Sequence, residues 1–381
     1  MKNTLLALCV LFSVSVSVST FAQVNNPIVT AVPSLSIAPD ARAGGMGDIG
    51  AATTPDVNSQ YWNPAKYVFM ESEAGLSVSY TPWLRKLVTD IDLAYLAGYW
   101  KFDQRQALSA SLRYFSLGDI TLMDQLGYPQ GSAHPNELAV DLAYSRMLSD
   151  KLSAAIALRF IYSDLNNGIN LSGGSEMYPG SSVAADISAY YKTPITMQSV
   201  DGNLAFGINI SNIGSKISYD QNETSNFIPT NLRIGGSFDY PLDNFNKISV
   251  SADINKLLVP TPKLNPTSAD IAAYNKMSPI AGIFKSFGDA PGGFKEEMQE
   301  VMWSIGAEYA YNNQFFVRGG YFNENQFKGN RKYFTAGAGF KLNVFQLDAG
   351  YVISTSQSNP LDQTLRFSLT FDLFGLKNLV R

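Results

Sequence analysis

The chain has 381 residues, of which 45% are hydrophobic and only 16% are charged, and its formal net charge is -4 at pH 7. An average soluble protein is about one quarter charged, so this chain is poor in charge, yet its mean hydropathy of -0.04 is too polar for a bundle of membrane helices. Aromatic residues make up 12% of the chain, which excludes a disordered protein. The acidic balance supplies no basic stripe for phosphate groups, so nucleic acid is not an expected partner.

The first residues are typical of a secretory signal peptide. Lys2 precedes an uncharged and mostly apolar stretch, and Ala22 is the kind of small residue after which signal peptidase cleaves. A membrane-spanning anchor is the alternative interpretation, but serines interrupt the stretch and no basic stop-transfer segment follows it. We therefore expect residues 1–22 to be removed and the mature protein to begin at Gln23.

Cysteine and histidine, the residues that most often bind metals or supply thiol chemistry, occur only once each. Cys9 is the single cysteine and lies inside the predicted signal peptide, after Leu8 rather than after a small residue, which also excludes a lipoprotein signal. His134 is the single histidine, in a turn-like Gly-Ser-Ala-His-Pro stretch without convergent partners. We therefore expect no catalytic site, no metal site, no cofactor and no disulfide, and we expect the protein not to be an enzyme.

From Glu73 to the end, apolar and polar residues alternate with the period of two that is typical of β-strands. The pattern predicts strands near residues 74–82, 91–102, 106–118, 137–148, 152–163, 181–193, 203–213, 230–242, 247–255, 301–311, 315–323, 332–342, 345–354 and 363–374. These are about fourteen strands, and most have the ~9 to 11 residues with which a tilted strand crosses a bilayer.

The lengths of the connections are a second, independent signal. Tight turns follow the second, fourth, eighth, tenth and twelfth predicted strands, and longer loops follow most of the others. An outer-membrane barrel has short periplasmic turns and long extracellular loops, whereas a soluble sandwich has no reason to sort its loops in this way. The sequence therefore predicts an all-β fold, a transmembrane antiparallel β-barrel of about 14 strands, with both chain ends on the side of the short turns.

One face of the predicted strands carries charges that lipid would not tolerate, so these side chains are expected in the lumen. They are Arg113, Arg159, Arg233, Asp239, Asp253, Glu308, Arg318, Asp348, Arg366 and Asp372. Because both signs are present, we expect ion pairs that brace the interior.

Residues 23–72 differ from the barrel region at 73–381, because they are rich in Pro, Gly and Ala and lack sustained alternation. The run from Gly45 to Gly50 matches the GxGxxG dinucleotide pattern, but Pro33 and Pro39 break the strand that should precede it and no βαβ unit follows. We predict instead an N-terminal plug or periplasmic segment, residues 23–72, whose small residues pack closely against, or inside, the barrel wall.

Two short stretches of this segment resemble the amino-terminal signature of the PorV family, the outer-membrane barrels of the Bacteroidota type IX secretion system. The first contains Pro39, Asp40, Arg42, Gly44, Gly45, Met46 and Gly47, and the second contains Asn63, Pro64 and Ala65. The Asn-Pro-Ala step is also similar to the broader FadL-like long-chain fatty-acid transporters. The resemblance implies fourteen strands, a plug in the lumen and a structural role for these residues.

The resemblance also implies a function and a location in the outer membrane of a Gram-negative cell, among outer-membrane lipid and lipopolysaccharide. PorV-like proteins bind secreted proteins that carry a C-terminal signal domain, receive them from the translocon barrel, and deliver them to a sortase-like attachment complex. The main alternative is a FadL-like channel for hydrophobic small molecules, although the charged lumen does not suit it. Another barrel of the same secretion system and a barrel enzyme also stay open.

The segment at about 256–300 interrupts the strand pattern and is too long for an ordinary hairpin loop. After three prolines it carries apolar residues at spacings of three and four, which predict a short amphipathic helix outside the cell. These residues are Ile271, Tyr274, Met277, Ile280, Phe284 and Phe287. The insertion is expected either to cap the barrel mouth or to dock a partner.

Overall fold

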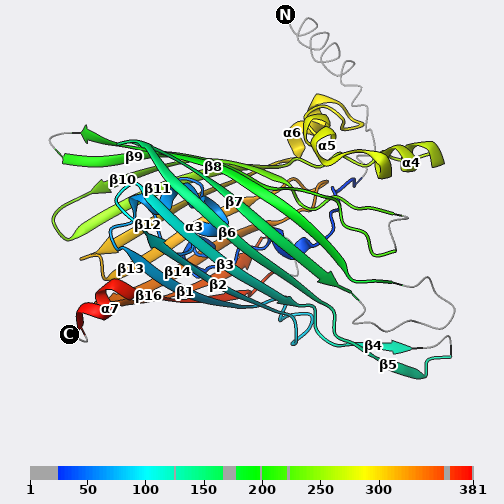
Figure 1. Cartoon of the computed structure of the whole chain (residues 1–381), viewed down its shortest axis with the longest axis horizontal. Coiled ribbons are helices and arrows are strands. Elements are labelled where there is room, and N and C mark those ends of the chain that lie inside the picture. Colours follow the sequence, from blue (N-terminus) through cyan, green and yellow to red (C-terminus); the bar gives the residue numbers. More distant parts are fainter. Residues whose placement is uncertain are drawn as a thin grey trace, which may run out of the picture.

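The computed structural model describes residues 25–123, 126–165, 177–197, 200–220, 224–355 and 361–379. Fourteen antiparallel strands form a closed barrel, as the sequence predicts (Figure 1). The predicted signal peptide and its cleavage site lie outside the described residues. In the described part of the chain, none of the helices has the length and apolar character needed to cross a membrane.

The barrel strands follow one another around the wall in chain order, and β1 closes the barrel against β16 from Gly75↔Asp372 to Tyr80↔Phe367. They are β1 (Ala74–Pro82), β2 (Asp92–Lys101), β3 (Gln106–Ser116), β6 (Asn136–Ser149), β7 (Leu152–Asp164), β8 (Gly180–Met197), β9 (Val200–Gly214), β10 (Asn231–Pro241), β11 (Asn246–Leu257), β12 (Val301–Tyr311), β13 (Phe315–Asn323), β14 (Lys332–Leu342), β15 (Phe345–Ser354) and β16 (Leu365–Asp372).

The end of the last strand and the loop after β3 differ from the sequence prediction. The last strand ends at Asp372, and Leu373–Leu379 forms a helix, α7, because the Asp372 carboxylate accepts the backbone amides of Phe374 and Gly375 and so caps a helical turn. A separate hairpin of β4 (Ile120–Met123) and β5 (Pro129–Ala133) extends the loop between β3 and β6. This hairpin was not predicted.

The alternation of side chains sorts the wall into a lipid face and a lumen face. On β7, Ile156, Leu158 and Phe160 point outward and are exposed, whereas Ala157 and Arg159 between them are buried in the lumen. A continuous outward-facing apolar band of this kind matches the hydrocarbon core of a bilayer.

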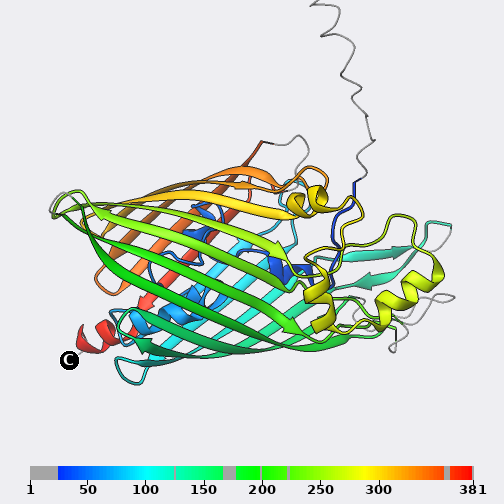
Figure 2. The same cartoon turned by 90° about the horizontal axis from the view of Figure 1, so that it is seen from above.

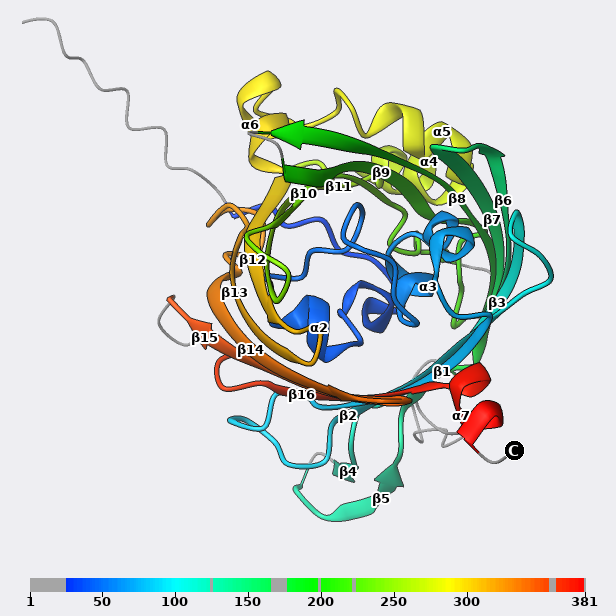
Figure 3. The same cartoon turned by 90° about the vertical axis from the view of Figure 1, so that its left-hand side faces the viewer.

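The N-terminal segment runs through the lumen (Figure 3). It contains the short helices η1 (Pro33–Ser36), α2 (Ala41–Gly44), α3 (Ser59–Trp62) and η2 (Pro64–Phe69), and it leads into β1 at the end of the barrel with the short turns. We call residues 38–69 the plug.

The described chain begins at the opposite end of the barrel, among the long loops (Figure 2). There the amide of Asn26 donates to the carbonyl of Phe327, 3.1 Å away, and its side chain donates to the carbonyl of Pro262 at 3.1 Å. The prediction that both chain ends lie on the turn side is therefore right for α7 and wrong for the first described residues, because the plug spans the lumen from one end to the other.

The insertion between β11 and β12 forms three short helices rather than one. They are α4 (Ser268–Lys276), α5 (Pro279–Lys285) and α6 (Phe294–Gln299). Pro279 starts α5 because it cannot donate the hydrogen bond that would continue α4.

Candidate functional site

The first stretch of the signature, Pro39 to Gly47, is buried inside the barrel. Asp40 begins α2, since its carboxylate accepts the Ala43 amide at 2.9 Å and the Trp62 indole N–H at 2.6 Å. Asp40 therefore joins the two halves of the plug to each other.

Arg42 fixes the plug to the wall through a chain of buried ion pairs. Its guanidinium donates to both oxygens of Glu308 on β12, at 3.1 and 3.0 Å, and to Asp56 in the plug at 2.8 Å. Arg318 on β13 donates to the same Glu308 at 2.6 Å and to Asp348 on β15 at 2.7 Å. One carboxylate thus holds an arginine from the plug and an arginine from the wall.

Two further contacts anchor the middle of the plug. Asp48 pairs with Arg366 on β16. The backbone amides of Gly50 and Ala51 both donate to Asp253 on β11, at 2.8 and 3.0 Å. The plug is therefore bound by charge or charge-assisted hydrogen bonds to strands on several sides of the lumen.

Two of the signature glycines, Gly45 and Gly47, lie where the plug backbone touches the wall backbone. A Cβ atom on Gly45 would lie 2.9 Å from the Cα of Gly337, and one on Gly47 would lie 2.9 Å from the amide nitrogen of Tyr321. Gly47 also has a φ of 80°, which disfavours other residues. Gly45 and Gly47 therefore allow the plug to pack closely against the wall.

The second stretch of the signature secures the end of the plug near the short turns. Asn63 donates to the carbonyl of Ala189 on β8 at 3.0 Å and accepts the Ala65 amide at 3.1 Å. Ser145 on β6 donates to the carbonyl of Pro64 at 2.8 Å. All three signature residues are buried, so the structure places them in contacts that shape the plug.

The charges expected in the lumen do brace the interior. Arg159 on β7 pairs with Asp141 on β6 and, at 3.0 Å, with Asp186 on β8, so that three neighbouring strands share one cluster. Most of the predicted set is buried, and Arg233 and Asp372 are partly exposed. The sequence did not indicate that the plug supplies so many of the partners.

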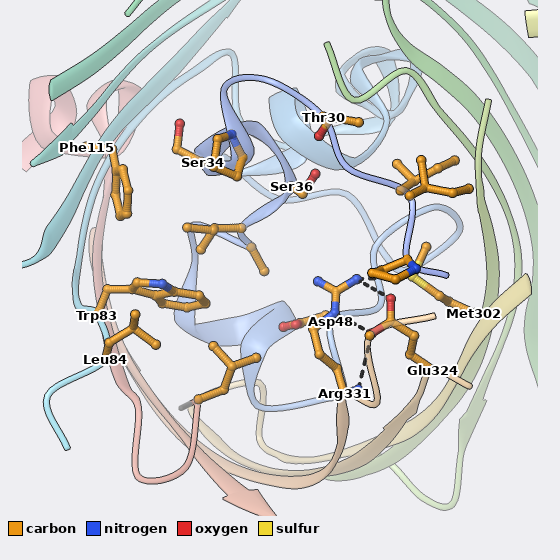
Figure 4. A pocket seen from close by; sticks show the side chains of 18 of the residues that line it. Thr30, Ser34, Ser36, Asp48, Trp83, Leu84, Phe115, Met302, Glu324 and Arg331 are labelled. Atoms are coloured by element: carbon orange, nitrogen blue, oxygen red, sulfur yellow. Dashed lines mark hydrogen bonds and ion pairs between the residues drawn. The ribbon is translucent and has the colours of Figure 1, made fainter. Parts of the chain in front are cut away.

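A cavity of about 550 Å³ lies between the plug and the wall at the loop end (Figure 4). Trp83, Leu84 and Phe115 form an apolar side, and Arg331 with Glu324 stands opposite, joined by two hydrogen bonds of 2.8 Å. The sequence analysis missed this cavity, because its lining combines the N-terminal segment, several loops and the ends of barrel strands, which are distant from one another in the chain.

A cluster of five charges at the rim attaches the insertion. Lys256 at the end of β11 pairs with Glu297 at 3.1 Å and Glu300 at 2.5 Å. Lys328 in the loop after β13 pairs with Glu296 at 2.5 Å and Glu300 at 3.0 Å. α6 is thereby tied to two parts of the rim.

The structure does not bring the six apolar residues predicted for docking into one cleft. Ile271, Ile280, Phe284 and Phe287 are exposed. Tyr274 and Met277 are partly buried, and the Tyr274 ring packs edge-on against Phe227 with centroids 5.2 Å apart. Their docking role stays a prediction.

Within the described ranges, no group of three or more His, Cys, Asp or Glu side chains is arranged to hold a metal ion. His134 is exposed in its loop, with Nδ1 at 2.5 Å from the Asp119 carboxylate.

Comparison with known proteins gives one family and a set of structural relatives. A family model described as type IX secretion system protein PorV matches residues 20–264. The toluene transporter TodX from Pseudomonas putida is 10% identical, with 86% of this chain and 96% of that chain covered and a TM-score of 0.50. A Pseudomonas aeruginosa FadL homologue is 11% identical, with 92% and 100% covered and a TM-score of 0.45. No curated protein sequence matches. At these identities the structural similarity concerns the fold alone.

Proposed function

The chain belongs to the PorV family, outer-membrane components of the type IX secretion system, and from this premise we propose that it is a cargo carrier. It binds secreted proteins that carry a C-terminal signal domain as they leave the translocon barrel. It then passes them to the sortase-like attachment complex on the cell surface. This activity is protein binding without catalysis.

The observation that carries the proposal is the plugged lumen. The plug is held by Arg42, Asp48 and the amides of Gly50 and Ala51, whose partners lie on β11, β12 and β16. Removing one partner of a buried ion pair costs about 3 to 5 kcal/mol, so several such contacts oppose displacement of the plug. A plug held in this way favours work at the barrel surface over passage through the barrel.

The surface best suited to this work is the loop end. Long loops carry function on rigid scaffolds in general, and here they surround the open cavity beside Trp83 and Leu84. Cargo that arrives from a neighbouring barrel in the same membrane meets this end without crossing the lumen.

A FadL-like channel for hydrophobic small molecules is the second candidate, and the cavity is the observation in its favour. Its apolar side would suit an apolar solute. Its lining also includes Asp48 and Arg366, the ion pair that joins plug to wall. A solute in the cavity would therefore face a closed, charged contact rather than an apolar path.

Site-specific photo-crosslinking tests the cargo proposal. A crosslinking amino acid at Leu87, 65% exposed in the loop after β1, should capture a cargo C-terminal signal domain in secreting cells. The matched control is Phe245, 59% exposed in the short turn between β10 and β11, which should capture none. Equal capture at both positions would refute a cargo site at the loop end. No capture at Leu87, together with cells that lose uptake of an apolar solute but still secrete cargo when the gene is missing, would favour the channel.

A further inference from the structure

The insertion of α4, α5 and α6 lies over the outer side of the wall at β8–β11 rather than across the lumen (Figures 1 and 3). The loop between β9 and β10 attaches the insertion to the barrel. The Lys216 ammonium donates to the carbonyls of Tyr274 and Asn275 at 2.9 and 3.1 Å. Gly282 of α5 faces Phe227 so closely that a Cβ atom would lie 2.7 Å from its ring. One face of α5 is therefore fixed to the barrel, and the opposite face is free.

The free face is apolar. Phe284 is 76% exposed, and Ile271, Ile280 and Phe287 are each at least half exposed. α4 has nine residues, none of them buried, and helices shorter than about 12 to 15 residues are marginal in water on their own. Exposed side chains of this size on so short a helix indicate a surface that is covered when the protein is in place.

The exposed charges of the insertion are basic, although the chain as a whole is acidic. Glu296, Glu297 and Glu300 turn toward Lys256 and Lys328 at the rim, and Asp270 pairs with Lys263. Lys276, Lys285 and Lys295 are exposed, and none of them has a carboxylate partner within 4 Å among the residues that the structure describes. The free surface thus combines large apolar side chains with lysines that form no ion pair within 4 Å in the described part of the chain, although the charge of Lys285 acts on the partly buried Asp289.

This combination continues the lipid-facing surface of the barrel. Phe206, Ile234 and Ile254 are exposed on the outer faces of β9, β10 and β11, the strands beside the insertion. A short element with apolar side chains and lysines at such a position has the composition of segments that lie in the membrane interface. Phosphate groups on lipids supply the complementary charge.

We propose that α4 and α5 rest on the outer leaflet of the membrane, with Ile280, Phe284 and Phe287 at the acyl boundary and Lys276 and Lys285 on lipid phosphates. The occupant of the free face is therefore the phosphate-bearing lipid surface and not a protein. This inference rests on the outer-membrane location of the barrel and does not depend on the cargo role.

A polarity-sensitive fluorophore on a single cysteine tests the proposal in the full chain carrying Cys9→Ser. Phe284→Cys places the fluorophore on the free face, and Gln326→Cys places it in the exposed loop after β13 as a control. In nanodiscs whose lipids carry a quencher on the acyl chains, the fluorophore at 284 should be blue-shifted and quenched and the one at 326 should not. Quenching at 284 should be stronger with phosphatidylglycerol or lipid A than with phosphatidylcholine alone, and salt should remove the difference.

A triple Lys276→Gln, Lys285→Gln, Lys295→Gln variant should lose the dependence on anionic lipid, whereas the matched triple Lys→Arg variant should keep it. Both variants should keep the heat-modifiable gel mobility of a folded barrel. Inorganic phosphate added in solution separates lipid phosphate from free phosphate, since only lipid phosphate should change the quenching. Equal emission and quenching at 284 and 326 in every nanodisc overturns the proposal. So does a fluorophore at 284 that becomes shielded only after a purified cargo signal domain is added, because the face would then dock protein.

Discussion

Glu308 should be the most sensitive single position in the attachment of the plug. Its two carboxylate oxygens accept hydrogen bonds from Arg42 and Arg318, and its side chain is only 4% exposed. Glu308→Gln keeps the shape of the side chain but removes the negative charge between two arginines. Each arginine keeps one other carboxylate, Asp56 at 2.8 Å and Asp348 at 2.7 Å.

The expected cost follows from those remaining partners. Removing one member of a buried ion pair costs about 3 to 5 kcal/mol when the other charge is left alone. Because neither arginine is left without a carboxylate, the lower end applies, and we expect Glu308→Gln to lower the free energy of unfolding by about 3 kcal/mol.

A double-mutant cycle checks the reasoning in detergent. Glu308→Gln, Arg42→Gln and the double variant are unfolded in denaturant, and the folded fraction is followed by heat-modifiable gel mobility. The double variant should be more stable than the sum of the single losses predicts, by about 0.5 to 3 kcal/mol, because the two residues contact each other. Glu71→Gln, an exposed carboxylate ahead of β1, is the control for loss of charge alone. If Glu308→Gln unfolds like this control, or if the two losses simply add, the plug is not held as described.

Three further predictions concern the wall, the plug and the rim. Leu158→Arg in the middle of β7 should impair membrane insertion by about 2 to 4 kcal/mol, whereas Leu148→Arg near the turn should cost about 0 to 1 kcal/mol. The two leucines are similarly exposed, at 64% and 61%, so they differ in their depth in the membrane. Equal folding yields of the two variants in lipid vesicles would contradict the assignment of the lipid face. Gly45→Val should lower the yield of folded barrel without creating or removing nucleotide binding, and measurable binding of NAD by the purified protein would show that the run is a ligand site after all. Burial is the largest single influence on Glu296 and opposes its ionisation, but the hydrogen bonds from Lys328, the Gly292 amide and Asn26, with the charge of Lys328, together lower the Glu296 pKa below its ordinary 4.5. The stabilisation of the rim by Glu296 is therefore complete above pH 4.5 and is lost as the pH falls through the lowered pKa. Protease cleavage of the insertion should rise in that acidic range, and cleavage independent of pH would refute the attachment.

The wall could be predicted strand by strand because its environment imposes a period of two. Because lipid lies on one side of the wall and a polar lumen on the other, successive residues of each strand must alternate between apolar and polar. Leu158 is apolar and faces lipid, whereas Arg159 is charged and faces the lumen. The plug could be predicted as small-residue packing for a similar reason, since Gly45 and Gly47 lack the side chains that would keep two backbones apart.

The remaining features depend on contacts between segments that are distant in the chain. The cavity joins Trp83, after the first strand, to Arg331, before the third-last strand of the barrel, and no local pattern connects them. The outward placement of the insertion depends on Phe227 and Lys216 in another loop. The β4–β5 hairpin has only short strands, and its sequence lacks the long alternation that revealed the others.

The path of the plug along the whole lumen has a consequence for how the wall is held together. The chain enters the lumen beside the extracellular loops and leaves it at the short turns, while its side chains occupy the space between. The contacts of the plug with Glu308 and Asp253 lie on β12 and β11, far in the strand order from the seam between β1 and β16, so they can form while that seam is still open. Strand number and stagger set the diameter of the cylinder. The same segment that obstructs the lumen also ties β11, β12 and β16 to one another across the interior.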